Sequence, residues 1–392
     1  MALQQSAAVP SAVAMEKGRV EMRHTYRSDD ESEDESSPPM MQACYYTKYG
    51  KPSVVQIGQL PRATLVAPDD ILVRVHAASI NPIDYKRREG AFKLILESKW
   101  PNIVGYDMAG VVVLCGTSVK NFHVGDEVFA CVPHDRIGTL AEFAAVPERA
   151  AALKPKNLSF IQAAAVPISA LVAMQTLRRL NLKPGQSFLL TGGSGGVGTF
   201  ALQLAKNVFK AGQIATTALQ QKDHILTRLG ADIIVDYSDS HFEKELTDYD
   251  CAMDCTSEAK KCVECVKSGG IVASIADTPP PEAMGDLEDE LHGRPSCCLG
   301  IVLGCLSYSM KAKARARSVE YAYVLVSPDG RMLREVATYC QDGLVRPVID
   351  KVFPFAQALE AMELLEAGHV TGKIVIEMPA NAAKDRHQPE SE

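Results

Sequence analysis

A glycine-rich turn constrains the fold of this chain more than any other feature. The run Thr191–Gly198 reads TGGSGGVG and spaces Gly193, Gly195 and Gly198 as G-x-G-x-x-G. An apolar strand is expected before it, at 187–191, and an amphipathic helix after it, at 198–209. In that context the first glycine permits a tight turn, the second lets backbone approach a pyrophosphate, and the third lets the helix pack on the strand.

The start of that helix adds unpaired N–H groups and a positive dipole, which attract phosphate. A purely structural glycine turn is the alternative interpretation. We expect a dinucleotide phosphate site, made by Gly193, Ser194, Gly195, Gly196, Val197 and Gly198.

Strands and helices alternate on both sides of the turn. Strands are expected at 213–218, 233–236, 249–254, 270–275 and 321–326, and helices at 161–180, 222–229 and 332–340. This alternation predicts a parallel sheet with helical crossovers, the doubly wound Rossmann type. Between residues 41 and 150, short β-rich runs separated by Gly, Pro and Asp predict a barrel-like β unit instead.

Composition excludes several other classes of protein. The net charge of -7 gives no sign of nucleic-acid binding. The longest uncharged stretches, 161–177 and 295–310, are shorter than the roughly 20 residues of a membrane helix. Eleven cysteines, an odd number in a long chain, indicate free thiols in a reducing compartment. Residues 1–40, with six carboxylates between Ser28 and Ser37, predict a disordered acidic tail that is either only solvated or phosphorylated and regulatory.

The strand after the glycine turn indicates which dinucleotide is bound. NAD sites usually carry a carboxylate about twenty residues after the turn, for the ribose hydroxyl. Here the strand ends in Ala218-Leu219-Gln220-Gln221-Lys222, without a carboxylate. Lys222 would suit a 2′-phosphate, which favours NADPH (NADP) over NAD. Asp223 follows directly and argues the other way, and an exposed lysine at a helix start is the alternative interpretation of Lys222.

The order of motifs resembles the medium-chain dehydrogenase/reductase superfamily, in particular its zinc-free quinone oxidoreductase and alkenal/enone reductase branch. The matching segments, spread over residues 41 to 378, are Ser79–Gly90, Gly105–Gly110, Gly125–Val128, the glycine turn, Leu229–Asp232 and His369–Lys373. Two groups look nearest, the plant alkenal/enone reductases and the mitochondrial reticulon-interacting oxidoreductases. The resemblance implies a GroES-like catalytic domain at 41–165, a Rossmann domain at 166–340, a return to the catalytic domain at 341–378 and a C-terminal tail at 379–392.

The resemblance also implies site residues. Lys86 and Asn81 would donate hydrogen bonds to the acceptor oxygen, Tyr237 would pack on the cofactor, and Lys373 would close over the nicotinamide side. For the first three there is a plainer alternative: a solvated lysine for Lys86, a backbone cap before Pro82 for Asn81 and an exposed loop for Tyr237. The chain departs from the family pattern at three positions, Val172, Leu219 and Gln220.

A metal is not expected. Zinc alcohol dehydrogenases of this superfamily carry a cysteine near the Asn81 position and a His-Glu pair at the Tyr106-Asp107 position. Catalytic zinc needs three protein ligands, and here those ligands are replaced. Cys251 and Cys255, on an expected core strand, are interpreted as buried thiols rather than as a metal cage.

Two functional hypotheses follow. The first is a zinc-independent NADPH-dependent oxidoreductase that reduces a quinone or the double bond of an α,β-unsaturated carbonyl. The second is a catalytically weak NADPH-binding protein that acts by binding a partner through its acidic tail. The resemblance further implies a homodimer formed through Tyr321–Val326. We also expect a role for Cys297–Tyr308 in either the substrate pocket or the dimer, and a cytoplasmic location with mitochondrion or plastid as alternatives.

Overall fold

The computed structural model describes residues 38–93, 99–136, 138–283 and 297–379. The predicted acidic tail lies almost entirely outside these ranges, as do residues 380–392 of the predicted C-terminal tail. In the described ranges, no helix is both long and apolar enough to cross a membrane.

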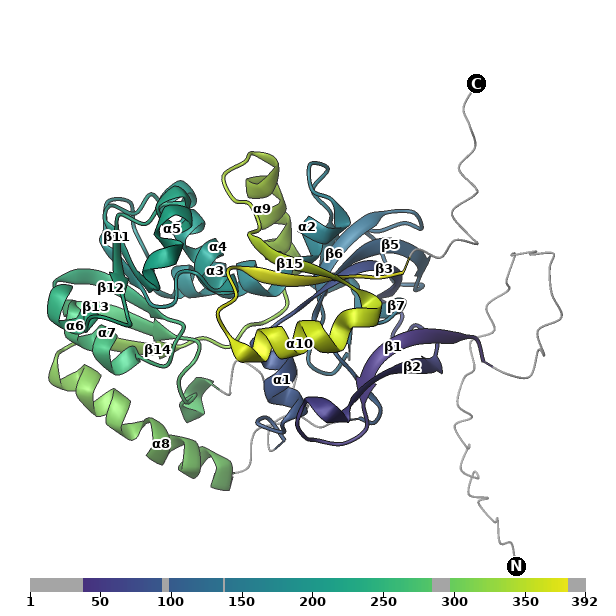
Figure 1. The fold of residues 1–392 in the computed structure, drawn as a ribbon, viewed down its shortest axis with the longest axis horizontal. Helices are drawn as coiled ribbons and strands as arrows, with labels where there is room; N and C mark the ends of the chain where they lie inside the picture. Colours follow the sequence, from purple (N-terminus) through teal and green to yellow (C-terminus); the bar gives the residue numbers. More distant parts are fainter. Residues whose placement is uncertain (1–37, 94–98, 137, 284–296, 380–392) are drawn as a thin grey trace, which may run out of the picture. The chain divides into compact units, whose positions relative to one another are not determined.

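A six-stranded parallel sheet carries the glycine turn (Figure 1). Its strand order is β11-β10-β9-β12-β13-β14, with every neighbouring pair parallel. In chain order these strands run 3-2-1-4-5-6, the arrangement of a dinucleotide-binding sheet. The strands are β9 Phe188–Leu190, β10 Ile214–Ala218, β11 Ile233–Asp236, β12 Tyr249–Asp254, β13 Val266–Ser274 and β14 Glu320–Tyr323. The predicted Rossmann fold is confirmed.

Helices lie before, between and after these strands in the chain. They are α2 Phe160–Ala164, α3 Pro167–Arg179, α4 Gly196–Gln203, α5 Asp223–Leu229, α6 Phe242–Glu245, α7 Ala259–Cys265, α8 Cys297–Ala316 and α9 Gly330–Gln341. The single helix predicted over 161–180 is wrong: α2 ends at Ala164 and α3 begins at Pro167, because a proline has no backbone N–H to continue the helical hydrogen bonds and its ring clashes with the preceding turn. The predicted helix 198–209 begins at Gly196 and widens into a π-helical turn at Leu204–Val208.

The β-rich part forms two further sheets. One is a seven-stranded sheet ordered β15-β16-β3-β5-β6-β8, with β7 also paired to β3, and the other is ordered β2-β1-β4. Their elements are β1 Met40–Tyr46, β2 Val55–Pro61, β3 Asp70–Ile80, β4 Asn102–Ile103, β5 Asp107–Cys115, β6 Glu127–Cys131, β7 Phe143–Pro147, β8 Ala151–Leu153, β15 Ile349–Pro354 and β16 Lys373–Glu377, with helices α1 Pro82–Arg88 and α10 Ala358–Ala367. This matches the predicted GroES-like unit.

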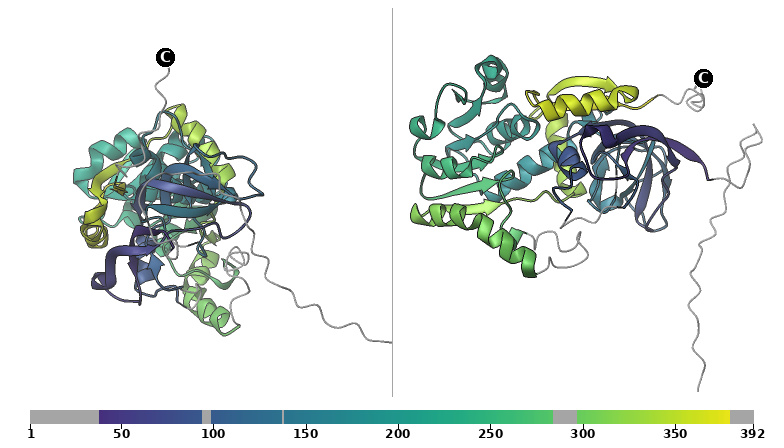
Figure 2. Two further views of the ribbon diagram at one scale, coloured as in Figure 1. Left: turned by 90° about the vertical axis from the view of Figure 1, so that its right-hand side faces the viewer. Right: turned by 60° about the horizontal axis from the view of Figure 1, so that its bottom comes forward.

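The end of the chain returns to this β-rich part. Figures 1 and 2 show β15, β16 and α10, in yellow, beside the strands formed by the first third of the chain. β16 pairs antiparallel with β3, and Ile374 lies opposite Ile80. This pairing brings Lys373, the first residue of β16, next to Asn81, which follows β3.

Candidate active site

The glycines of the turn are required for two different reasons. A Cβ atom on Gly193 would lie 2.2 Å from Oγ1 of Thr216, and one on Gly198 would lie 2.3 Å from the carbonyl oxygen of Gly192. Both positions therefore exclude a side chain by packing. A Cβ on Gly195, in contrast, would have no atom closer than 3.5 Å, so the space beside its backbone is open. This is the cradle that a pyrophosphate needs.

The left-handed backbone of the turn belongs to Gly192, with a φ of 72°. The sequence analysis assigned the tight turn to Gly193 and left Gly192 out of the site. The glycine doublet Gly192-Gly193 is the sequence feature that could have indicated this. Gly192 has a backbone conformation that favours glycine, whereas Gly193 has to be glycine because of packing.

The chain end is joined to this turn. The backbone N–H of Gly372 donates to the carbonyl oxygen of Ser194 at 2.8 Å, and Gly372 forms a parallel bridge with Gly195. The same chain segment also contacts Lys222, whose ammonium donates to Oγ1 of Thr371 and to the carbonyl oxygen of His369. Residues 369–373 thus contact the phosphate turn and the predicted 2′-phosphate lysine together.

An open depression lies beside the second strand, where the adenosine end of a dinucleotide is expected. Its lining residues are Leu219, Gln220, Gln221, Asp236, Ser238 and Asp239. Asp236 accepts a hydrogen bond from the backbone N–H of Gln220 at 2.8 Å, and bonds from Ser238 hold the pKa of Asp236 below its usual value. The sequence analysis missed this carboxylate. Because β10 and β11 are parallel neighbours, their carboxyl ends meet, and that adjacency was the available signal. Tyr237 follows Asp236 and is half exposed.

Lys373, Asn81 and Asp107 form a buried polar cluster. The Asn81 side-chain amide donates to Oδ2 of Asp107 at 2.9 Å, and the Lys373 ammonium lies 3.3 Å from the same oxygen. That ammonium also donates to Oδ1 of Asn81 and to the carbonyl oxygen of Ile80. All three ammonium hydrogens therefore have acceptors. Burial lowers the pKa of Lys373, and the nearby Asp107 opposes that effect.

Asp107 is the centre of this cluster. Besides Asn81 and Lys373, its carboxylate accepts from Oγ of Ser79 at 2.8 Å and from the backbone N–H of Ile168 at 2.7 Å. Ile168 is near the start of α3, so one carboxylate ties β3, β5, β16 and α3 together. From the sequence, Asp107 is noted only at the position of a replaced zinc ligand, and this role is not predicted.

Lys86 lies apart from the cluster. It is exposed on α1, and its side chain bonds to none of Asn81, Asp107 or Lys373 in the described ranges. Its neighbours Arg87 and Arg88 are buried instead. Arg88 pairs with Glu366 on α10, and Arg87 donates to the hydroxyl of Tyr106 at 2.5 Å.

Tyr106 and His134 complete a second buried group that sequence reasoning missed. Nδ1 of His134 lies 3.2 Å from the Tyr106 hydroxyl. Burial, with a further contribution from Arg87, lowers the pKa of His134 to about 4, so the imidazole is neutral near pH 7. Burial also raises the pKa of Tyr106 to about 12. A neutral imidazole can accept the tyrosine proton, while the tyrosine oxygen accepts from Arg87.

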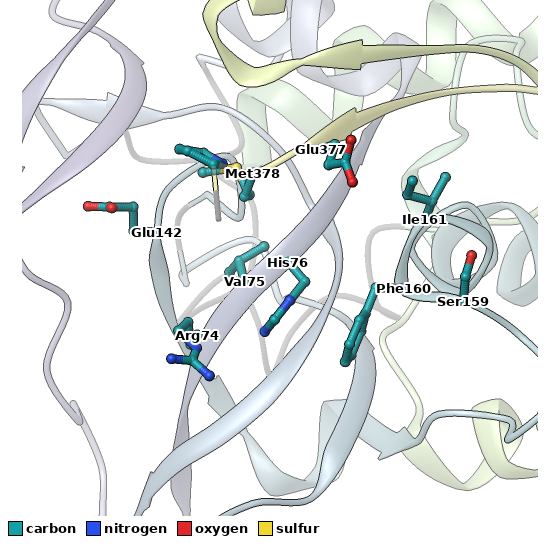
Figure 3. Close-up of a pocket in the computed structure, with 10 residues that line it drawn as sticks. Arg74, Val75, His76, Glu142, Ser159, Phe160, Ile161, Glu377 and Met378 are labelled. Carbon is teal, nitrogen blue, oxygen red and sulfur yellow. The ribbon is translucent and has the colours of Figure 1, made fainter. Parts of the chain in front are cut away.

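A separate surface pocket lies beside the middle of β3 (Figure 3). His76 and Phe160 stack there with ring centroids 4.4 Å apart, between Arg74 and Glu377. None of the predicted site residues lines this pocket. About five residues of extended strand, roughly 16 Å, separate His76 from Asn81, so we do not assign it to the active site.

The described part of the chain contains no group of three or more His, Cys, Asp or Glu residues that could hold a metal ion. Cys251 is buried on β12, and burial raises its pKa to about 12, which disfavours the thiolate that metals bind. Cys262, on α7, is buried as well, and its pKa is raised for the same main reason.

Comparison with known proteins shows the family. Residues 67–156 match the alcohol dehydrogenase GroES-like domain, and residues 229–376 match the zinc-binding dehydrogenase family. The chain is 36% identical over 352 residues to 2-methylene-furan-3-one reductase of Solanum lycopersicum, covering 87% of this chain and 80% of the relative. It is 35% identical over 353 residues to the chloroplastic NADPH-dependent alkenal/one oxidoreductase of Arabidopsis thaliana, covering 88% and 81%.

A solved structure agrees with these matches. The quinone oxidoreductase from Coxiella burnetii superposes with a TM-score of 0.75 at 27% identity, over 87% of this chain and all of that one. The fold and site thus define an oxidoreductase with a dinucleotide-binding sheet. The chain belongs to the medium-chain dehydrogenase/reductase superfamily, in its quinone and alkenal/enone reductase branch, as the sequence predicted.

Proposed function

We propose that this protein is an NADPH-dependent reductase that delivers hydride to a quinone or to the double bond of an α,β-unsaturated carbonyl without a metal. One observation carries the proposal. The buried cluster of Asn81, Asp107 and Lys373 is joined to the phosphate turn by consecutive residues, since Gly372 bonds to Ser194 and Lys373 bonds to Asn81. A cofactor held at the turn would thus lie next to the segment that also carries Lys373 of the polar cluster.

The residues fit an NADPH molecule at its two phosphate groups, the central pyrophosphate and the 2′-phosphate of the adenosine ribose. The open space beside Gly195 suits the pyrophosphate, and Lys222 suits the 2′-phosphate. Asp236 and Asp239 line the depression beside the second strand, and their negative charges would repel the 2′-phosphate. The preference for NADPH over NADH therefore rests on Lys222. Relatives named for NADPH support this assignment. When bound, NADPH supplies the hydride.

The residues of the chain would position the acceptor and stabilise its charge. The acceptor oxygen becomes more negative as hydride arrives, and fixed donors lower the barrier for that change. The amide of Asn81 is held in orientation by Asp107 on one side and Lys373 on the other. Its second N–H is the donor we assign to the acceptor oxygen. Lys373 uses its own hydrogens on protein acceptors, so we assign it to orienting Asn81.

Lys86 is the second proposed donor. Its side chain is exposed on α1 and has no ion pair in the described ranges, so it is free to reach an acceptor that enters from solvent. The resemblance to alkenal/enone reductases supports this role. Tyr237, half exposed beside the depression, remains the proposed contact of the cofactor.

Independence from zinc rests on the chemistry of the side chains. The positions that hold ligands in zinc enzymes of the superfamily are Asn81, Tyr106 and Asp107 here, and the Lys373 ammonium occupies the space beside them. A cation already in contact with Asp107 disfavours a second cation there.

Consumption of NADPH with matched quinones, alkenals and enones, with NADH as control, tests the proposal. We expect turnover with at least one acceptor class, undiminished by a chelator, and no zinc in stoichiometric amount by elemental analysis. If purified protein consumes no NADPH with any acceptor, the reductase proposal is wrong. If a chelator abolishes turnover and zinc restores it, the metal-free mechanism is wrong.

We also propose a homodimer formed at β14. This strand is the last of the six-stranded sheet and pairs with β13 on one side, with no other partner strand in the described ranges. Figure 1 shows α8 beside it, and α8 exposes Ile301, Val302 and Leu306. Light scattering after gel filtration should give twice the 42.4 kDa chain mass. A mass of one chain would contradict the proposal.

The cytoplasmic location stays a proposal, and the name of the Arabidopsis relative, which includes the chloroplast, supports the plastid alternative. Fluorescence microscopy of the full-length chain carrying a C-terminal fluorescent protein separates the two. Diffuse signal would support the first, and signal confined to an organelle would contradict it.

A further inference from the structure

A small cavity lies between β1, α1 and the segment before β5. Its polar lining residues are Tyr46, Asp84, Arg87, Asn102 and Tyr106. Its volume is about 10 Å³, which is about the space that one water molecule needs. No sequence motif pointed to it, because its walls come from four separate stretches of chain.

Three buried polar atoms around this cavity lack a hydrogen-bond partner in the described ranges: Oη of Tyr46, Nε of Arg87 and Nδ2 of Asn102. The three residues are only 1%, 5% and 2% exposed. Buried polar groups are almost always paired with protein or with ordered water, because an unpaired one has lost its hydration without compensation. Three such atoms around one cavity indicate a common partner.

The chemistry of the lining points to water rather than an anion. Arg87 and Asn102 donate hydrogen bonds, the tyrosine hydroxyl can donate or accept, and the Asp84 carboxylate only accepts when ionised. A water molecule accepts from the two donors and donates to the two oxygens, so it satisfies all four. An anion could not bond to Asp84 and would be repelled by it.

Asp84 connects the cavity to the candidate active site. One of its carboxylate oxygens accepts the backbone N–H of Asn81 at 2.7 Å, and the other accepts that of Gly105 at 3.1 Å. Gly105 directly precedes Tyr106 and Asp107. A single buried carboxylate therefore holds together the two segments that supply Asn81 and Asp107.

We propose that one internal water molecule fills this cavity, bonds to Tyr46, Arg87 and Asn102, and supports Asp84 as the positioning residue that holds Asn81 against Asp107 and Lys373. The proposal deepens the function given above, and rests on it only where catalytic rates are concerned.

The charges around Asp84 agree with this arrangement. Burial raises the pKa of Asp84 to about 7; the Asn81 backbone bond lowers it, Asp107 raises it and Lys373 lowers it. On the neighbouring elements, burial raises the pKa values of Cys44, Tyr46 and Tyr106, so these groups stay neutral near pH 7, and Arg87 is the cation that faces the cavity. A water molecule oriented by Arg87 stabilises the ionised carboxylate.

A high-resolution crystal structure of the full chain tests the water molecule directly. We expect one ordered water within hydrogen-bond distance of Oη of Tyr46, Nε of Arg87 and Nδ2 of Asn102. An empty cavity, or one closed by a shifted side chain, would overturn the proposal.

The coupling to Asp84 is tested by titration of its carboxyl carbon, observed by NMR. Tyr46→Phe removes one bond to the water and should raise the pKa of Asp84 by about one unit, the equivalent of about one weakened hydrogen bond to a charge. Tyr45→Phe is the matched control, because Tyr45 directly precedes Tyr46 on β1 and lies outside the cavity lining. It should leave the pKa of Asp84 unchanged. Identical titration of Asp84 in wild type and Tyr46→Phe would overturn the coupling.

Kinetics tests the positioning role. In Tyr46→Phe the pH profile of kcat should shift with the Asp84 titration, while the Kd for NADPH stays the same because the glycine turn is untouched. A parallel loss of NADPH affinity would contradict a role confined to Asn81. If no acceptor is reduced at all, the proposed function fails, but the water and the titration still decide this inference.

Discussion

Replacing Lys373 by Met isolates the buried charge that connects the chain end to the candidate site. The side chains of Lys373 and Asp107 are 3% and 0% exposed, and their charged atoms lie 3.3 Å apart. The variant leaves the Asp107 carboxylate buried without its cation. Breaking such a pair costs roughly 3–5 kcal/mol of unfolding free energy.

The expected cost lies at the lower end, about 3 kcal/mol, because Asp107 retains other donors. Ser79, Asn81 and the backbone of Ile168 still bond to it at 2.7–2.9 Å. The methionine also keeps much of the aliphatic stem, so little packing is lost.

Urea unfolding followed by Trp100, the only tryptophan of the chain, measures this cost. The matched control is Lys156→Met, at an exposed lysine, which should change the unfolding free energy by no more than about 0.5 kcal/mol. The double variant Asp107→Asn/Lys373→Met removes both charges and should cost less than the two single variants added together. A Lys373→Met protein as stable as the control, or strict additivity in the double variant, would refute the buried ion pair.

Three further results are expected. Lys222→Glu should weaken NADPH binding by at least about tenfold more than NADH binding in calorimetry, since a charge-assisted bond to the 2′-phosphate is lost; equal losses would refute the assignment. Gly195→Val should lower NADPH affinity without lowering the melting temperature, because its Cβ meets open space; unchanged affinity would mean that the cradle is not used. For His134, burial lowers the folded-state pKa to about 4, so between pH 6.5 and 4 the unfolded chain binds more protons. His134 therefore costs stability as the pH falls, about 2 kcal/mol by pH 5. His134→Gln should flatten that loss relative to wild type, whereas the exposed control His123→Gln should not; equal slopes in all three proteins would contradict a buried neutral imidazole.

The glycine turn could be predicted from sequence because its requirements are local. Eight consecutive residues specify a turn, a cradle and a helix start, and the strand before it fixes the context. The parallel sheet around it also follows from the alternation of strands and helices, since parallel strands need crossover connections. Two finer local features were not predicted: the break in the helix before Pro167 and the different roles of Gly192 and Gly193. Both depend on backbone conformation.

The polar cluster could not be predicted from spacing because its members are far apart in the chain. Lys373 and Asn81 are 292 residues apart and meet only because β16 pairs with β3. Asp107 enters from a third strand, β5. A resemblance suggested Lys373 and Asn81 individually, but only the tertiary pairing shows that each fixes the orientation of the other.

The basic run Lys86-Arg87-Arg88 shows most clearly what cannot be predicted from sequence alone, namely which side chain is buried and which is exposed. Sequence alone offers three adjacent cations as equals, but neighbouring residues on a helix point about 100° apart. On α1 this turns Arg87 toward Tyr106, Arg88 toward Glu366, and Lys86 toward solvent. The two arginines are thereby bound to internal partners, and Lys86 is the cation of the three that we propose as a donor to an incoming acceptor. The exposure of Lys86, which at first argues against a catalytic role, is thus the property that leaves it free to have one.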